Sequence, residues 1–409
     1  MSLSEPGMTH STKMGKRHSA SRRIIFTLLT HIRDAGLRIC DPHLGDHFFG
    51  DAKAALQAEV HVRHTRAYRR VLLGGSIAAA ESYMDDDWDT PDLTAVIQVL
   101  ALNMAVTDRL EARLSWLTTP LNKLIHGLRR NSVRQAKRNI AAHYDLGNDF
   151  YRAFLDQSMQ YSSAWYRTAD LTLEQAQEAK LHRLCQQLAL QPGDHLLEIG
   201  TGWGALAEFA ARHYGCRVTT TTISQEQYQF ARQRIADAGL SEQVTVLCQD
   251  YRTLQGQFDK LVSVEMVEAV GRRYIPLFIQ RCQQLVKPGG RMVLQAITIS
   301  PERYESYASG VDFIQRYIFP GGFLPSVALL EQTLSAHSDY QVDDIFEIGG
   351  DYARTLREWR QRFDHAWPQL ENGQFDRRFR RMWLFYLCYC EAGFLARTIG
   401  TVQLTAVRP

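Results

Sequence analysis

A glycine-rich turn carries the clearest chemical signal in the sequence. Residues 197–204 read Leu-Glu-Ile-Gly-Thr-Gly-Trp-Gly, and a helical stretch from Ala205 to Tyr214 follows the last glycine. Glycine at Gly200 and Gly202 lets the backbone approach a ligand where a Cβ atom would obstruct it. The spacing differs from the Gly-x-Gly-x-x-Gly of dinucleotide enzymes, and many tight strand-to-helix turns use glycine for geometry alone. The turn therefore points to a nucleotide-type ligand only together with its surroundings.

The next strand ends in hydroxyl groups instead of a carboxylate. Strands at this place in nucleotide-binding folds usually end in Asp or Glu, which binds ribose hydroxyls. Here the sequence runs through four threonines, 219–222, and then Ile-Ser-Gln. Thr222 and Gln227 lie where the strand opens and can hydrogen-bond a ligand without a charge. The first three threonines fit a buried β-branched strand.

The elements around these residues predict an α/β fold. Beyond residue 190, short apolar runs bounded by turn residues alternate with helix-length spacers such as 226–238 and 274–286. The pattern predicts a doubly wound, largely parallel sheet. The expected strands are His195–Ile199, Cys216–Thr221, Val244–Leu247, Lys260–Val264 and Arg291–Ala296. The tail beyond about residue 355 is rich in Arg and aromatic residues, and we expect it to be helical.

In this setting the glycine-rich turn resembles motif I of the S-adenosylmethionine (SAM) methyltransferases. Asp250-Tyr251 follows the third strand, 258–262 begins the fourth, and the turn 285–290 precedes the fifth, as in that class. The resemblance implies a class I SAM-methyltransferase (Rossmann-like) doubly wound sheet, with a small N-terminal α+β domain before it. The cofactor-binding residues it implies, with the two strand-end residues above, are Tyr161, Ser162, Glu198, Gly200, Gly202, Thr222, Gln227, Asp250 and Tyr251.

Five further segments narrow the resemblance. They are residues 143–150, 159–165, 264–271, 313–322 and 351–352. In this order they resemble the cyclopropane-fatty-acid synthase family, which includes the mycolic acid cyclopropane synthases. The resemblance covers roughly residues 140–400 closely and the N-terminal domain more loosely. It implies SAM-dependent methyl transfer to the double bond of unsaturated acyl chains of membrane phospholipids.

The chemistry of that reaction makes demands on the site. Methyl transfer to an alkene leaves a carbocation on the chain, and loss of a proton from the new methyl closes a cyclopropane ring. The site must be dry, must tolerate a cation and must place a base beside the methyl group. Aromatic faces stabilise cations through the ring quadrupole, although each ring is as readily explained by core packing. The rings available are Tyr144, Tyr161, Phe319 and Tyr352, of which Tyr144 and Phe319 are expected to bind substrate.

In the family that this chain resembles, a bound bicarbonate acts as the base. Its ligands map by motif onto Ser163, Glu268, Gln295, Ile297 and Tyr352. Ser163 stands in place of a family Cys, and Ala269 and Gln295 stand in place of His. Ser and Gln still hydrogen-bond an oxyanion, so we expect an anion site of altered polarity.

Two further titratable groups accompany this set. His143 is a candidate for a base or for a group that supports one, and the alternative is that it caps a helix or packs in the core. Glu265 lies one turn before Glu268, and the family motif favours the later position.

Alternative activities remain open from the sequence. A relative that only methylates the chain would leave a methyl-branched or methylene product. An N-methyltransferase of the same fold would act on a soluble amine without lipid vesicles. A non-catalytic lipid-binding relative would bind SAM without turnover, or not at all.

The amino-acid composition limits the number of domains and the kinds of partner that the chain can have. The 409 residues suggest two or three domains, and 45% hydrophobic residues allow substantial cores. Lys plus Arg total 47 against 44 for Asp plus Glu, which argues against a nucleic-acid coat. The seven cysteines are scattered without a C-x-x-C pair, so we expect reduced thiols and no metal site. The dense carboxylates at 85–89 fit a solvated, capping turn better than a cation site.

The charge is unevenly distributed. Seven Lys or Arg and no acidic residue lie between Arg113 and Tyr144, and further pairs stand at Lys16-Arg17, Arg377-Arg378 and Arg380-Arg381. Such clusters favour anionic lipid headgroups. We therefore expect a cytoplasmic protein attached peripherally to the inner face of the membrane, compatible with a homodimer. The expected parts are a disordered basic tail (1–22), a small domain (23–110), a basic helical linker (111–140) and the catalytic domain with its lipid-substrate insertion (141–409).

Overall fold

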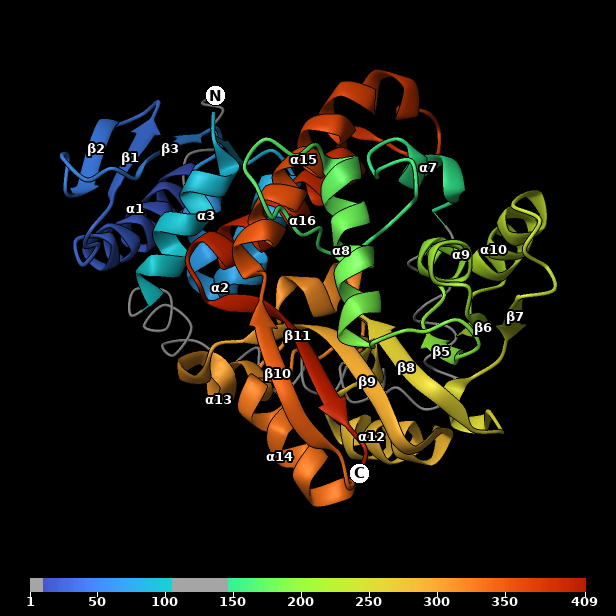
Figure 1. The fold of residues 1–409 in the computed structure, drawn as a ribbon. Helices are drawn as coiled ribbons and strands as arrows, with labels where there is room; N and C mark the ends of the chain where they lie inside the picture. The colour runs from blue at the N-terminus through green and yellow to red at the C-terminus, as the bar shows by residue number, and fades with distance from the viewer. Residues whose placement is uncertain (1–9, 105–145) are drawn as a thin grey trace, which may run out of the picture. The chain divides into compact units, whose positions relative to one another are not determined.

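A computed structural model of the chain describes residues 10–104 and 146–409 and divides the chain into two compact units (Figure 1). Unit 1 consists of Met1–Lys123 and Glu371–Ala396. Unit 2 consists of Leu124–Leu370 and Arg397–Pro409. The sequence-based boundary placed all of 141–409 in one catalytic domain. The structure instead groups the helix within Glu371–Ala396 with unit 1.

Unit 1 is built on a four-stranded sheet with strand order β2-β1-β3-β4. β1 pairs antiparallel with β2 and parallel with β3, and β3 pairs antiparallel with β4. The strands are β1 (Gly36–Asp41), β2 (Gly45–Gly50), β3 (Gln57–Val62) and β4 (Trp88–Asp89), and the helices are α1 (His10–Leu29), α2 (Arg66–Met84), α3 (Leu93–Leu102) and α16 (Arg377–Leu395). α1 begins at His10, inside the tail that was expected to be disordered.

The acidic turn at 85–89 is ion-paired with arginines of unit 1. The pairs include Arg70 with Asp87 at 2.8 Å, Arg377 with Asp86 at 2.9 Å and Arg378 with Asp85 at 2.9 Å. Asp87 is fully buried, so these partners balance a charge that would otherwise be costly to bury. The charge of Arg377 and Arg378, which we expected to face anionic lipid, is balanced within the unit.

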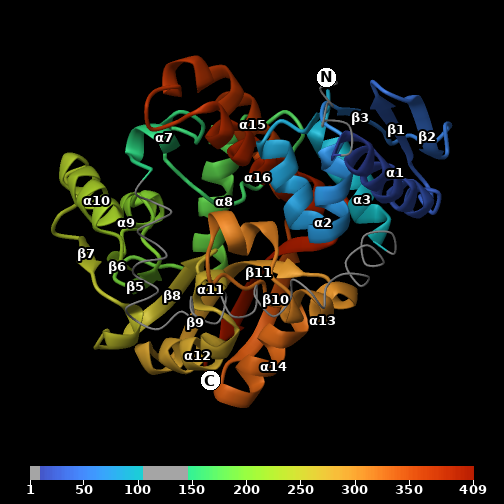
Figure 2. The same cartoon turned by 180° about the vertical axis from the view of Figure 1, so that it is seen from behind.

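Unit 2 is built on a seven-stranded sheet with order β10-β11-β9-β8-β5-β6-β7 (Figures 1 and 2). Strands β5 to β9 are parallel. β11 pairs antiparallel with β9, and β10 pairs antiparallel with β11, so β10 again runs in the direction of β9. The strands are β5 (His195–Ile199), β6 (Arg217–Thr222), β7 (Val244–Cys248), β8 (Phe258–Val264), β9 (Val286–Ile299), β10 (Gln341–Glu347) and β11 (Ile399–Val407). The predicted class I methyltransferase sheet is confirmed.

Helices cover both faces of this sheet because neighbouring residues on its strands point to opposite sides. Leu197, Leu261 and Leu294 belong to the core under α12 and α14, whereas Leu196 and Val262 belong to the core under α8 and α9. The unit 2 helices are α7 (Asn148–Arg152), α8 (Leu173–Gln187), α9 (Ala205–Tyr214), α10 (Gln225–Asp237), α11 (Val267–Val270), α12 (Ile275–Leu285), α13 (Pro301–Ser309), α14 (Val327–His337) and α15 (Gly349–Leu370), with short turns η1 (Tyr251–Thr253), η2 (Arg272–Tyr274) and η3 (Ile314–Ile318).

The C-terminal tail departs from its prediction. α15 and α16 confirm helices beyond residue 355, but the last element, β11, is a strand, so the expectation of a helical tail was wrong there. β11 pairs with β9 over nine residues, from Ile399 opposite Ile299 to Val407 opposite Arg291. Within the described ranges, no helix is both long and apolar enough to cross a membrane.

Candidate active site

The glycine-rich turn joins β5 to α9 at the carboxyl edge of the sheet. Gly200 and Gly202 have φ of 105° and 52°, a region that glycine adopts readily. The amide of Gly200 donates to the Thr221 carbonyl at 3.0 Å, which ties the turn to β6. A Cβ atom built on Gly202 would meet no atom of residues 10–104 or 146–409 within 4 Å. The turn thus exposes backbone toward open space, as a bound ligand requires.

Glu198, at the end of β5, is the buried polar group of this turn. Its side chain is 4% exposed, and burial raises the pKa of Glu198 to about 8. Among the described residues its Oε2 atom has no hydrogen-bond partner. Buried acceptors are rarely left unsatisfied, so the atom calls for a donor from beyond the described residues. The ribose hydroxyls of SAM are such donors, and the residues present therefore fit that group.

Thr222 and Gln227 bond to each other at the end of β6. Thr222 Oγ1 donates to Gln227 Oε1 at 2.9 Å and accepts the amide of Ser224 at 3.1 Å. The pair uses the carbonyl end of the Gln227 side chain, so its NH₂ group is the end that can donate to a ligand. Both residues are buried at the opening that the sequence indicated.

Asp250 and Tyr251 have different surroundings. Both carboxylate oxygens of Asp250 accept hydrogen bonds from the Arg252 side chain, at 2.9 and 2.6 Å. Asp250 also accepts the Arg252 amide and so caps η1. The Tyr251 ring packs edge-on against Phe278 at 5.4 Å between centroids. The structure therefore gives Asp250 a role in holding the turn that carries Tyr251.

A buried carboxylate collects the residues expected to bind an anion. Glu265 Oε1 accepts hydrogen bonds from the Ser163 amide at 2.9 Å and from Gln295 Nε2 at 2.8 Å. Its Oε2 accepts from the Tyr352 hydroxyl at 2.6 Å. Three of the predicted residues thus converge on Glu265, whereas the sequence favoured Glu268. Ser163 contributes its amide, because its hydroxyl donates to the Ala164 carbonyl.

The backbone holds Glu265 in an unusual conformation. Its φ is +48°, which non-glycine residues adopt uncommonly and which concentrates at functional sites. Its amide donates to the Gln295 carbonyl at 2.7 Å, directly after β8. The Gln295 side chain is oriented in turn by Gln403, whose Nε2 donates to Gln295 Oε1 at 3.0 Å. Gln295 therefore presents its NH₂ group, and not its oxygen, to the carboxylate.

Glu268 is the second buried carboxylate of the site. Its Oε1 accepts the Ile297 amide at 2.5 Å, so the structure brings these two candidate residues together. Its Oε2 has no hydrogen-bond partner among the described residues. Burial, and then the charge of Glu265, raise the pKa of Glu268 to about 8. The Glu268 carboxyl therefore favours its protonated form at neutral pH, whereas the hydrogen bonds that Glu265 accepts favour the charged form of that carboxylate.

Lys180 is a buried cation beside this pair. Its side chain is fully buried on α8, and its Nζ donates to Ser162 Oγ at 2.7 Å. Burial lowers the pKa of Lys180 to about 8, and the charges of Glu265 and Asp156 oppose that shift. Burial raises the pKa of Glu265, whereas the hydrogen bonds from Tyr352, Gln295 and Ser163 and then the Lys180 charge lower it. Lys180 thus favours the ionised form of Glu265.

Aromatic rings connect the glycine-rich turn to the carboxylates. We call this set the aromatic wall, and its members are Tyr151, Tyr161, Trp203, Phe319, Tyr352 and Trp359. Trp203 of the turn lies 5.0 Å from Tyr151, which lies 5.4 Å from Tyr161. Tyr161 lies 5.3 Å from Trp359 and 6.5 Å from Phe319, and Trp359 lies 6.0 Å from Tyr352. Tyr161, Phe319 and Tyr352 are thus brought together, whereas His143 and Tyr144 lie outside the described residues.

Comparisons with known proteins agree with this geometry. The model of the family described as mycolic acid cyclopropane synthetase matches residues 131–404. The chain belongs to this family. A tuberculostearic acid methyltransferase of Mycobacterium tuberculosis is 41% identical over 347 residues, which is 83% of this chain and 81% of the relative. The cyclopropane-fatty-acyl-phospholipid synthase of Escherichia coli is 37% identical over 364 residues, 86% and 88% of the two chains.

Solved structures of the cyclopropane synthetase family share the fold of unit 2. The cyclopropane synthase MmaA2 of Mycobacterium tuberculosis covers 66% of this chain and 98% of its own, with a TM-score of 0.62 and 28% identity. A mycolic acid cyclopropane synthase in complex with SAH, S-adenosylhomocysteine, gives a TM-score of 0.62, 30% identity and the same coverages. As a member of the cyclopropane synthetase family, this chain is a SAM-dependent methyltransferase.

The sequence analysis did not identify Lys180, Tyr151 or Trp359 as residues of the site, and it preferred Glu268 to Glu265. Lys180 follows an ordinary amphipathic helix pattern, and only its neighbours in space reveal it as a buried charge. Glu265 had one local signal, a carboxylate directly after a buried strand at the carboxyl edge of the sheet. Catalytic groups collect at that edge in parallel α/β folds.

Lys180→Met tests the electrostatic role of this buried cation. Losing the positive charge raises the pKa of Glu265, so the carboxylate ionises at a higher pH. We expect the acidic limb of the kcat/KM profile to move to higher pH, with lower activity on that limb and an unchanged plateau above it. Lys287→Met, which removes an exposed lysine paired with Asp259, serves as the control. An unshifted profile with uniformly lower kcat would assign Lys180 a purely structural role.

Proposed function

We propose that this enzyme transfers the methyl group of SAM to the double bond of unsaturated fatty acyl chains of phospholipids, and that the product is a cyclopropane ring. The observation that carries the proposal is the buried Glu265 carboxylate, which receives three hydrogen bonds beside an aromatic wall. The substrate class is supported by the names of the relatives, a cyclopropane-fatty-acyl-phospholipid synthase and fatty acid methyltransferases.

The glycine-rich turn would hold the methyl donor. Gly200 and Gly202 expose backbone, Glu198 Oε2 offers an unsatisfied acceptor for ribose, and Gln227 offers an amide donor. When bound, SAM supplies an electrophilic methyl group on a sulfonium. Ser162 is expected at the same site, where Lys180 orients its hydroxyl.

The aromatic wall suits a cationic acyl chain. Tyr161, Trp359 and Phe319 present tilted rings at centroid distances of 5.3 and 6.5 Å. A ring face near a desolvated cation contributes on the order of 2 kcal/mol. The rings also exclude water, which would otherwise capture the carbocation.

Glu265 would be the base. Methyl transfer would break the S–CH₃ bond of SAM and release S-adenosylhomocysteine, while the alkene electron pair forms one C–C bond and leaves the neighbouring carbon cationic. Glu265 then removes a proton from the new methyl, and the C–H electron pair closes the ring. The donors expected to bind bicarbonate, namely the Ser163 amide, Gln295 and Tyr352, already bond to Glu265. The residues present therefore do not fit bicarbonate, and we assign its part to Glu265.

A methylene product is the second candidate, favoured by the similarity to tuberculostearic acid methyltransferase. A hydride shift before proton loss gives an exomethylene group through the same base. A saturated methyl branch needs, in addition, a hydride and a proton, so it requires a reductant that methyl transfer does not supply. The base and the aromatic wall serve the cyclopropane and the methylene outcome alike, and these two differ only in the path of the cation.

The test is product analysis with purified enzyme, SAM and vesicles of monounsaturated phospholipid. We expect one added carbon per double bond and upfield ring-methylene protons by NMR. Cyclopropane and methylene products are isomers, so mass alone does not separate them, whereas vinyl protons identify the methylene product. Methylation of a soluble amine without methylation of lipid would replace this proposal with N-methyltransfer.

Access to acyl chains implies work at a membrane surface. We propose peripheral attachment on the cytoplasmic side through the basic stretch 113–144, which lies outside the described residues. Assembly as a homodimer is part of the same proposal. Binding to anionic vesicles that weakens as salt is raised would support the attachment, because exposed charges are screened by salt.

A further inference from the structure

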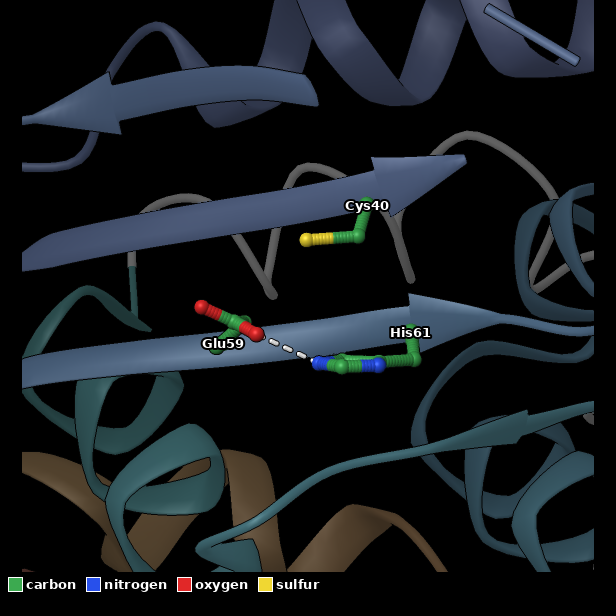
Figure 3. Close-up of side chains that lie close together, drawn as sticks. All are labelled: Cys40, Glu59 and His61. Atoms are coloured by element: carbon green, nitrogen blue, oxygen red, sulfur yellow. Dashed lines mark hydrogen bonds and ion pairs between the residues drawn. The ribbon is translucent and has the colours of Figure 1, made fainter. Parts of the chain in front are cut away.

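The small sheet of unit 1 gathers a thiol, an imidazole and a carboxylate on one face. Cys40 of β1 lies opposite His61 of β3 in the parallel register. Glu59 precedes His61 by two residues and therefore shares its face of the strand. Figure 3 shows the Cys40 sulfur pointing toward β3, where the Glu59 carboxylate meets the His61 ring. This cluster is separate from the site in unit 2.

The three side chains bring their ligand atoms close together. One ligand atom from each lies within 4.8 Å of the others, and Glu59 Oε1 is 2.5 Å from His61 Nε2. Asp46 of β2 is the register partner of Cys40 on the opposite edge of β1, and its negative charge raises the pKa of the Cys40 thiol after burial and Glu59. Three neighbouring strands thus contribute to one group. Arg38 is the nearby cation, with Nε 3.9 Å from Glu59 Oε2, the carboxylate oxygen not bonded to His61.

We propose that Cys40, Glu59 and His61 bind a zinc ion, with Asp46 placed to complete a tetrahedral set. Zinc takes sulfur, nitrogen and oxygen ligands at about 2.0–2.3 Å, so its donor atoms stand roughly 3.5 Å apart. The present separations need only small side-chain movements to reach that spacing. A thiolate with imidazole selects zinc over magnesium or calcium, which prefer all-oxygen sites.

The ligand set explains why the sequence did not predict this site. Its members lie on three strands at positions 40, 46, 59 and 61, and only the register of the sheet brings them together. The cysteines form no C-x-x-C pair, which is the pattern that sequence reasoning recognises. The site would cross-link β1, β2 and β3, because binding to the folded sheet alone stabilises it.

The experiment uses the full-length protein, stripped with a chelator and titrated with zinc against a competing indicator. We expect one zinc ion per chain and a melting temperature that rises with zinc. Cobalt in place of zinc should give a thiolate-to-cobalt charge-transfer band. Cys40→Ser and His61→Ala should each weaken zinc binding by at least about tenfold and, for Cys40→Ser, remove the cobalt band.

Cys390→Ser is the matched control, since it removes another partly buried thiol of unit 1. It should keep the stoichiometry and the cobalt band. All ligand positions are at least partly exposed, so circular dichroism should show each variant folded. Absence of zinc binding by the wild-type protein would overturn the proposal. Unchanged binding by Cys40→Ser and His61→Ala would overturn it equally, because the metal would then be held elsewhere.

Discussion

Glu265→Gln should lower methyl-transfer turnover on unsaturated phospholipid by about 10²–10⁴-fold, the usual contribution of a positioned base. Glutamine keeps the size of the side chain and a carbonyl oxygen that accepts from Ser163 or Tyr352. It cannot take a proton from the new methyl group at neutral pH. SAM affinity should stay close to wild type, because the glycine-rich turn is unchanged. Radiolabel transfer to vesicles and SAM calorimetry measure the two quantities.

Glu268→Gln is the matched control for this prediction. Glu268 holds a proton at neutral pH, since burial and the charge of Glu265 raise its pKa to about 8. An amide resembles that protonated form, so we expect a much smaller loss of turnover. A large loss in Glu268→Gln together with near-normal Glu265→Gln would exchange the two roles. It would restore the assignment that the family motif favours.

Gly202→Asn should weaken SAM binding by roughly 5- to 150-fold, equivalent to about 1–3 kcal/mol of steric conflict. Gly202 has φ of +52° and open space around the position of a Cβ atom, which we assign to the ligand. Asparagine tolerates this left-handed conformation better than other side chains, so the fold should survive. Isothermal titration with SAM and with S-adenosylhomocysteine measures the effect.

Gly239→Asn provides the comparison for this variant. Gly239 also has a positive φ, +70°, and no atom within 4 Å of a Cβ atom, but it follows α10 away from the turn. Its substitution should leave SAM affinity unchanged. Equal affinities in the two variants would show that the space over Gly202 is not used by the ligand.

The sequence by itself determined the alternation of elements in unit 2. β5 and α9 begin and end at the residues predicted, His195–Ile199 and Ala205–Tyr214. Both are bounded by local signals, because apolar runs and glycine turns act over a few residues. The same locality identified the glycine-rich turn and the strand end at Thr222. Neither required knowledge of distant contacts.

Only the tertiary structure decided the edge of the sheet and the place of α16. β11 was expected to be helical, yet it pairs with β9, which lies about a hundred residues earlier. Its state is set by the strand it joins, since strand preference depends on neighbours more than helix preference does. α16 groups with unit 1 through partners such as Asp85 and Asp86, which are distant in sequence.

Tertiary contacts also decide which of the two glutamates receives the hydrogen bonds of the site. Glu265 and Glu268 are three residues apart, and no local pattern states which of them meets Gln295 and Tyr352. The left-handed backbone at Glu265 and its amide bond to Gln295 turn that carboxylate toward the donors. The sequence therefore predicted the reaction class and most of the site residues, whereas the pairing of β8 with β9 determines which carboxylate faces the donors. Burial raises the pKa of both carboxyls, and the hydrogen bonds from Tyr352, Gln295 and Ser163 then favour the charged form of Glu265, which only the folded chain brings about.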